Sequence, residues 1–217
     1  MIIPKTREQI ELMRESALIV SKTLGMIARE IKPGITTQYL DKLAEEFIRD
    51  HGAEPGFLGL YDCPCTLLAS VNEAIVHGLP TNRPLEEGDI VSADCGAFKN
   101  GFYGDHAYTF EVGEVAPEVK KLLQITKESL YTGIREFKAG NRVEDVGNAI
   151  QKYTEAAGGG GGRGMRVVNR EEDLIEAAKQ TREEAGVNGP AHAEVVFGGG
   201  LGLDAQQRGK GGGEQGG

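Results

Sequence analysis

The sequence predicts an α+β fold, and three observations lead to that prediction. Two amphipathic helix patterns open the chain, several short strand-like runs occupy residues 65–112, and two further helix patterns follow before Ala157. Because the strand-like runs follow one another without intervening helices, we expect an antiparallel sheet flanked by helices.

The first two helices are predicted from their spacing and their end signals. Residues 6–31 carry apolar side chains three and four residues apart, which places them on one stripe of a long helix. The segment KPGITT should end that helix. A second helix should follow, with Thr37 as its N-cap and Gly52 at its end.

The middle and later elements are predicted in the same way. Alternating and β-branched runs indicate strands at residues 65–71, 74–78, 89–98 and 102–112. Apolar periodicity indicates two more helices, at residues 117–137 and 143–157.

The composition changes after Ala157, because 18 of the 32 glycines lie beyond it. We therefore expect one domain over residues 1–157 and a glycine-rich tail over residues 158–217. One helix is expected in the tail, from Arg170 to Ala185. From Gly198 onward the sequence has too few apolar residues to offset the entropy of ordering it, so we expect disorder there.

Charge and composition exclude several kinds of partner. The net charge of −9 argues against binding to nucleic acid or to an anionic membrane surface, and no apolar run is long enough for a membrane span. The first residues become charged too early for a secretory signal peptide, so we expect a cytoplasmic protein. The cysteines Cys63, Cys65 and Cys95 lack the spacing of a zinc site or a disulfide framework, and we expect reduced structural thiols.

Two aspartates on an expected hairpin suggest a metal site. If FKNG, residues 98–101, is a four-residue loop, Asp94 and Asp105 are cross-strand neighbours with Cβ atoms roughly 5 Å apart. Two carboxylates at that distance repel each other unless a cation lies between them, and hard divalent cations prefer carboxylate ligands. The alternative is that one aspartate caps the turn while the other is solvated, or that a bulge separates their faces.

A histidine is the second candidate. The segment SVNEAIVHGLP places His77 at the end of a short strand, before a glycine and a proline, where a rigid loop would present the imidazole to a cleft. The alternative is a histidine with a purely structural role, which is the commoner case for a single histidine.

Three segments in this order, VNEAIVHG, EEGDIVSADCG and NGFYGDHAYTFEVG, resemble type I methionine aminopeptidases, and the likeness covers residues 1 to about 157. The resemblance implies the first half of the pita-bread fold. It implies that Asp94 and Asp105 bind divalent metal (Mn, Co, Fe or Zn, two ions in the family), with Asp105 bridging both ions. It also implies that His77 is catalytic and contacts the substrate.

The resemblance further implies a substrate-binding wall between Phe57 and Cys65. Tyr61, Cys63 and Cys65 are the candidates to line the pocket for a methionine side chain. Asn72 and Glu73 are expected to shape the turn before His77.

The family's second half supplies a histidine in a GHG-type motif and two glutamates. Neither that motif nor an IEP-like segment occurs after residue 157, where His192 is the only histidine and Glu194 lies two residues beyond it. The resemblance therefore implies an incomplete metal site and impaired turnover.

The tail is similar to the glycine-rich lid and following helix of biotin carboxylases, which have the ATP-grasp fold. That similarity implies that Gly160, Gly161, Gly162, Arg163 and Gly164 close over ATP phosphates. However, Glu155 stands where a lysine is expected, and its carboxylate would repel a phosphate. We favour the interpretation of these glycines as a linker or fusion scar.

Three functions follow as hypotheses. The first is a metal-dependent aminopeptidase that removes methionine from the N-terminus of a peptide or nascent chain. The second is an ATP- or phosphate-binding module built on the glycine loop. The third is a non-catalytic, truncated or chimeric chain whose exposed sheet face favours self-association.

Overall fold

The computed structural model describes residues 4–158. These residues form two compact units, 4–113 and 114–158. The first unit contains the helices α1 (Arg7–Glu30) and α2 (Thr37–Asp50), the short 3-10 helix η1 (Leu60–Asp62), and the strands β1 (Glu54–Pro55), β2 (Leu67–Val71), β3 (Ile90–Lys99) and β4 (Phe102–Glu111). The second contains α3 (Pro117–Arg135) and α4 (Val143–Gly158).

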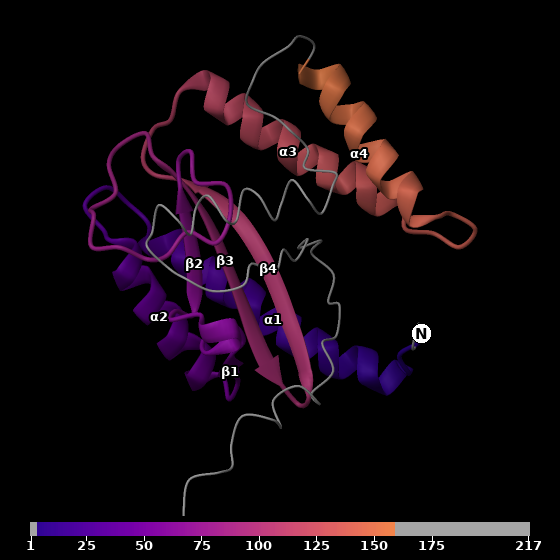
Figure 1. The fold of residues 1–217 in the computed structure, drawn as a ribbon, viewed down its shortest axis with the longest axis horizontal. Helices are drawn as coiled ribbons and strands as arrows, with labels where there is room; N and C mark the ends of the chain where they lie inside the picture. Colours follow the sequence, from indigo (N-terminus) through magenta and orange to yellow (C-terminus); the bar gives the residue numbers. More distant parts are fainter. Residues whose placement is uncertain (1–3, 159–217) are drawn as a thin grey trace, which may run out of the picture. The chain divides into compact units, whose positions relative to one another are not determined.

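The sheet is antiparallel throughout and is built around β3. Strand β4 pairs with the whole length of β3. The other edge of β3 pairs with β2 over residues 91–95 and with the two-residue β1 near Phe98. Helices α1 and α2 lie against one face of this sheet (Figure 1). The α+β prediction and its antiparallel sheet are therefore confirmed.

The predicted helix ends agree closely with the structure. Thr6 caps α1 in a capping box with Gln9, in which the Thr6 side chain accepts from the Gln9 N–H and the Gln9 side chain accepts from the Thr6 N–H. Helix α2 is capped by Thr36, one residue before the predicted Thr37. The Thr37 hydroxyl instead donates a hydrogen bond to the Thr81 carbonyl and accepts one from the Thr81 N–H.

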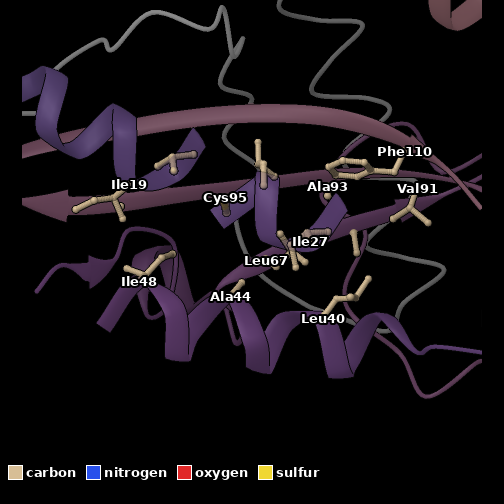
Figure 2. Packing of buried hydrophobic residues seen from close by; sticks show 14 of the residues in the cluster. Ile19, Ile27, Leu40, Ala44, Ile48, Leu67, Val91, Ala93, Cys95 and Phe110 are labelled. Atoms are coloured by element: carbon tan, nitrogen blue, oxygen red, sulfur yellow. The ribbon is translucent and has the colours of Figure 1, made fainter. Parts of the chain in front are cut away.

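The hydrophobic core lies between the sheet and the two helices. Figure 2 shows Ile27 of α1 and Leu40 and Ile48 of α2 directed toward Leu67 and Val91 of the strands. All five side chains are fully buried. Burial of each is worth roughly 1.5–3 kcal/mol relative to exposure, so this layer is the main stabilising contribution in the first unit.

Gly104 of β4 allows helix α1 to approach the sheet closely. A Cβ atom at this position would lie 2.5 Å from the Ala17 nitrogen and 2.5 Å from the Ser16 carbonyl carbon. The Ser16 hydroxyl, buried at the same point, donates to the Phe102 carbonyl. The close backbone contact at Gly104 shows that α1 packs on the sheet face toward which a residue-104 side chain would point.

The second unit is a pair of packed helices. Gly133 of α3 lies against Ile150 of α4, since a Cβ at residue 133 would be 2.7 Å from Ile150 Cδ1. The Tyr153 hydroxyl of α4 donates a hydrogen bond to the Glu128 carboxylate of α3. Both helices agree with the predicted ranges, with α3 ending two residues before residue 137.

One predicted strand was wrong, and one short strand was not predicted. The predicted strand at residues 74–78 is an irregular loop, because Asn72 and His77 adopt left-handed backbone conformations, with φ of 54° and 57°, that a strand does not accommodate. The two-residue strand β1 was not predicted, since Glu54 and Pro55 are too few to show alternation.

Several predictions concern residues 159–217, which lie outside the described part of the chain. They include the helix from Arg170 to Ala185, the disorder from Gly198 onward, and the extent of the tail. Among the described residues, no helix combines the length and the apolar composition needed to cross a membrane.

Candidate metal and substrate site

The sheet has two faces of different character. On the face toward α1 and α2, β3 presents Val91, Ala93, Cys95 and Ala97, all of them fully buried. Because successive side chains of a strand alternate between faces, Asp94 points to the opposite face. Asp105 shares this second face, since it pairs with Gly96, two residues from Asp94 along β3. The two aspartates are therefore on the same side, as predicted, and no bulge separates them.

The register that joins them differs from the predicted one. The turn contains two residues, Asn100 and Gly101, with φ of 54° and 83°, and Lys99 pairs with Phe102. Positive φ at both positions is the type I′ geometry that Asn-Gly favours. Asp94 therefore pairs with Ala107, and Asp105 is its diagonal neighbour rather than its direct partner.

The diagonal arrangement still brings the two carboxyl groups together. Burial, followed by the charge of Asp105 and a hydrogen bond with it, raises the pKa of Asp94 to about 7. Oδ1 of Asp94 is a buried atom that has no hydrogen-bond partner among the described residues. A buried acceptor of this kind can bind a further ligand.

The Asp94 and Asp105 carboxylates fit a divalent cation. Carboxylates are preferred ligands of hard cations, and a doubly charged ion would relieve the repulsion that raises the Asp94 pKa. The donor set among residues 4–158 is small, because no group of three or more His, Cys, Asp or Glu side chains is placed there to hold a metal. A cation held by these two carboxylates would need further ligands to complete its coordination.

His106, the residue after Asp105, does not belong to this face. It pairs with Cys95, whose side chain is buried on the side of the helices. Burial lowers the pKa of the His106 imidazole and thereby favours its neutral form. The alternation of β4 thus separates His106 from the two carboxylates, although the three residues are close in sequence.

His77 lies in a loop fastened to the free edge of β2. The Ala69 N–H donates to the Gly78 carbonyl at 2.7 Å, and the Gly78 N–H donates to the Ser70 hydroxyl at 3.0 Å. A Cβ on Gly78 would lie 2.6 Å from the Ala69 oxygen, so only glycine permits this approach. His77 therefore immediately precedes a residue that is hydrogen-bonded to β2, the neighbour of β3. The His77 φ of 57° is a strained backbone conformation of the kind found at functional sites.

A hydrogen-bonded clamp that was only partly predicted shapes the start of this loop. Asn72 was expected to shape the turn, and its amide donates to Asp89 Oδ1 at 2.7 Å while its carbonyl oxygen accepts from the Ile90 N–H. Asp89, which was not singled out, is 7% exposed and also accepts from the Glu86 N–H. Its signal in the sequence was an acidic residue placed at the start of a strand, which is too common to be specific.

The segment from Phe57 to Cys65 borders the aspartate face at one end. A Cβ on Gly96 would be 2.9 Å from the Phe57 ring, so this ring lies over Gly96, beside its pairing partner Asp105. Phe57 had been named only as the end of the segment. A glycine inside a strand indicates a close approach by another group, so Gly96 was the signal in the sequence that could have pointed to a contact such as that of Phe57.

The three substrate candidates in that segment have different surroundings. Tyr61 is 54% exposed and has a left-handed φ of 49°. Cys65 is buried, and the hydrogen bond with Cys63, followed by burial, raises its pKa. The Cys63 and Cys65 sulfurs are 3.6 Å apart. Their role as a pocket wall stays a prediction.

The remaining predicted site residues lie outside the described residues. These are the nucleotide-binding candidates Gly160, Gly161, Gly162, Arg163 and Gly164, and the two residues considered as additional metal ligands, His192 and Glu194.

Two carboxylates on one face of an antiparallel sheet are the kind of site that binds a divalent metal. The profile of metallopeptidase family M24 matches residues 11–207, and the chain belongs to this family. The match continues past Ala157 into the glycine-rich tail, which the sequence had led us to treat as separate from the domain.

The similar proteins are methionine aminopeptidases. The chain is 48% identical over 158 residues to the methionine aminopeptidase of Clostridium perfringens, covering 73% of this chain and 64% of that protein. It is 46% identical over 155 residues to methionine aminopeptidase 1 of Bacillus subtilis, covering 71% and 62%. The chain thus spans somewhat less than two thirds of the length of these relatives.

Solved structures agree with this placement. The methionine aminopeptidase of Thermotoga maritima matches with a TM-score of 0.71 at 38% identity, over 73% of this chain and 64% of that one. A prolidase from Pyrococcus furiosus matches with a TM-score of 0.64 at 23% identity, which supports the fold alone. The fold is that of the pita-bread family, as the sequence predicted.

Proposed function

We propose that this chain is a metal-dependent aminopeptidase that acts on the N-terminal methionine of peptides and nascent chains. The observation that carries the proposal is the pair Asp94 and Asp105 on the sheet face opposite the helices, where burial and the charge of Asp105 raise the pKa of Asp94. Membership of a metallopeptidase family and relatives named methionine aminopeptidase support it.

In this proposal Asp94 and Asp105 would hold a divalent cation, and Asp105 would be a ligand of both ions where two bind. Such a cation would supply an activated water and polarise the substrate carbonyl. The contribution of the chain is to bury the two carboxylates, so that their charge is poorly screened and their affinity for the cation is raised. A cytoplasmic location agrees with nascent chains as substrates.

His77 is proposed to contact the substrate at its amide or amine. The hydrogen bonds of Gly78 to β2 support this role, because they restrict where the His77 ring can go. Placing a hydrogen-bonding group in advance lowers the entropic cost of reaching the reactive geometry. The Phe57 ring, which lies over Gly96, is proposed as part of the apolar wall beside the metal.

We expect the turnover of the isolated chain to be low. Among residues 4–158 no third carboxylate or histidine joins the pair, and a general base is needed to accept the proton of the attacking water. Residues 159–217 or another chain would have to supply it. The non-catalytic alternative, with self-association through the open sheet face, remains a hypothesis that size-exclusion chromatography tests.

The function is tested by release of methionine from a Met-Ala-Ser peptide with added Mn²⁺ or Co²⁺. We expect slow release that chelation abolishes and that Asp94→Asn abolishes. Arg14→Ala is a matched control, because the exposed Arg14 side chain pairs with exposed Glu11 of the same helix, and it should leave the rate unchanged. Release that persists in Asp94→Asn would contradict the proposal.

A further inference from the structure

The Cys63-Pro64-Cys65 segment places two thiols side by side in the first unit. The two sulfur atoms are 3.6 Å apart, and the Cys63 thiol also lies 3.5 Å from the Cys65 carbonyl oxygen. Neither thiol is oxidised. A disulfide requires an S–S distance near 2.0 Å, so the two sulfur atoms must approach each other to form one.

The two cysteines differ in accessibility. Cys65 is 4% exposed, whereas Cys63 is half-buried. A dissolved oxidant therefore reaches Cys63 first. The hydrogen bond between the two thiols, followed by burial, raises the pKa of Cys65, which keeps this thiol protonated beside its neighbour.

The backbone around the pair is fixed on both sides. Asp41 of α2 accepts hydrogen bonds from the N–H groups of Thr66 and Leu67, both at 2.8 Å, which holds the chain immediately after Cys65. On the other side, the Gly59 N–H donates to the Cys63 carbonyl and the Cys63 N–H donates to the Leu60 carbonyl. These bonds limit the separation of the two thiols, which raises their effective concentration toward each other.

We infer that Cys63 and Cys65 form a reversible redox site that closes to an intramolecular disulfide with low-molecular-weight disulfides as oxidant. The Cys63 thiolate attacks one sulfur of the oxidant, forming a mixed disulfide and expelling one thiolate. Cys65 then loses its proton and attacks the Cys63 sulfur, expelling the second thiol. In total two cysteine thiols lose two electrons and two protons, and one disulfide reagent becomes two thiols.

Cys95 provides an internal reference for this inference. It is fully buried on the helix-covered face of β3, and burial raises the pKa of its thiol. It should therefore stay reduced under conditions that oxidise the pair. The inference is independent of the proposed peptidase activity, because its readout is the number of thiols.

The experiment counts thiols in the unfolded protein before and after incubation of the folded, metal-free full chain with oxidised glutathione. The wild type should fall from three thiols to one, as a monomer that is lighter by two hydrogen atoms and carries no glutathione. Cys63→Ser should keep two thiols throughout, while Cys95→Ala should fall from two to none. Dithiothreitol should restore all thiols.

Three results would overturn the inference. They are a wild type that retains three thiols, one that accumulates a stable glutathione adduct, and one whose loss of thiols coincides with a disulfide-linked dimer. Each of these can occur whether or not the chain releases methionine, so failure here and failure of the proposed function are distinguishable.

Discussion

Asp94 and Asp105 are diagonal neighbours across the β3–β4 ladder, because Asp94 pairs with Ala107 and Asp105 with Gly96. Burial of Asp94, followed by its interaction with Asp105, raises the pKa of Asp94 to about 7. The metal-free protein therefore holds a repulsion that a divalent cation would convert into attraction, and several predictions depend on this relationship.

Replacement of Asp94 by asparagine should have opposite effects without and with metal. Without metal, Asp94→Asn should raise the free energy of unfolding at pH 8 by about 1–3 kcal/mol, because it removes a buried charge beside Asp105. With Mn²⁺ at one hundred times its dissociation constant, the wild type should gain about 2.7 kcal/mol and the variant much less.

Urea denaturation with and without Mn²⁺ measures both effects. Asp50→Asn is the control, since Asp50 is exposed at the end of α2 and should leave the metal effect unchanged. Equal stabilisation of wild type and Asp94→Asn by Mn²⁺ would exclude Asp94 as a ligand.

The stability of the metal-free protein should fall as pH rises from about 4 to about 7. The folded pKa of Asp94, about 7, lies above its ordinary value of 3.8, so within this window the folded state keeps a proton that the unfolded chain has lost. The stabilisation is complete below the unfolded value and disappears as pH passes the folded value. Asp94→Asn should show a flatter profile, and identical profiles would show that another group is responsible.

The hairpin register depends on the Asn100-Gly101 turn. Gly101→Ala should cost about 1–2 kcal/mol, because a φ of 83° is costly for a residue with a Cβ atom. Gly25→Ala is the matched control: nothing lies within 4 Å of its Cβ position in α1, and the change should be neutral or stabilise by up to about 1 kcal/mol. Thermal unfolding of both variants measures the two changes in the free energy of unfolding. Equal losses of stability would contradict the proposed role of the turn.

The clamp between Asn72 and Asp89 should control the order of the loop that carries His77. Asp89→Ala removes the acceptor for Asn72 and for the Glu86 N–H, and should cost about 1–3 kcal/mol. Amide hydrogen exchange should then rise over residues 72–78 and change little in α4. Uniform exchange changes throughout the chain would instead indicate global destabilisation.

The sequence predicts the helices and the shared face of the aspartates better than it predicts the contacts between strands. Regular apolar spacing is a property of one segment, so α1, α2, α3 and α4 could be located from the sequence. The register depends on two backbone angles at Asn100 and Gly101, and treating the turn as four residues displaced every pair.

The site was harder to predict than the elements that carry it. Asp94 and Asp105 were found because the expected hairpin places these two like charges close together across neighbouring strands. The contact of Phe57 with Gly96 and the clamp of Asp89 on Asn72 join segments distant along the chain, and such contacts arise only after the sheet has formed.

The central claim is that the Asp94 and Asp105 carboxylates together bind a divalent cation, and a titration of the chain with Mn²⁺ tests it most directly. Free Mn²⁺ is measured by its electron paramagnetic resonance signal in wild type, Asp94→Asn and Asp105→Asn at pH 7.5. The account predicts that the wild type depletes the free signal and that each single variant weakens binding at least about tenfold, a loss of about 1.4 kcal/mol or more. A wild type that leaves the free signal unchanged, or variants that bind as well as the wild type, would contradict it.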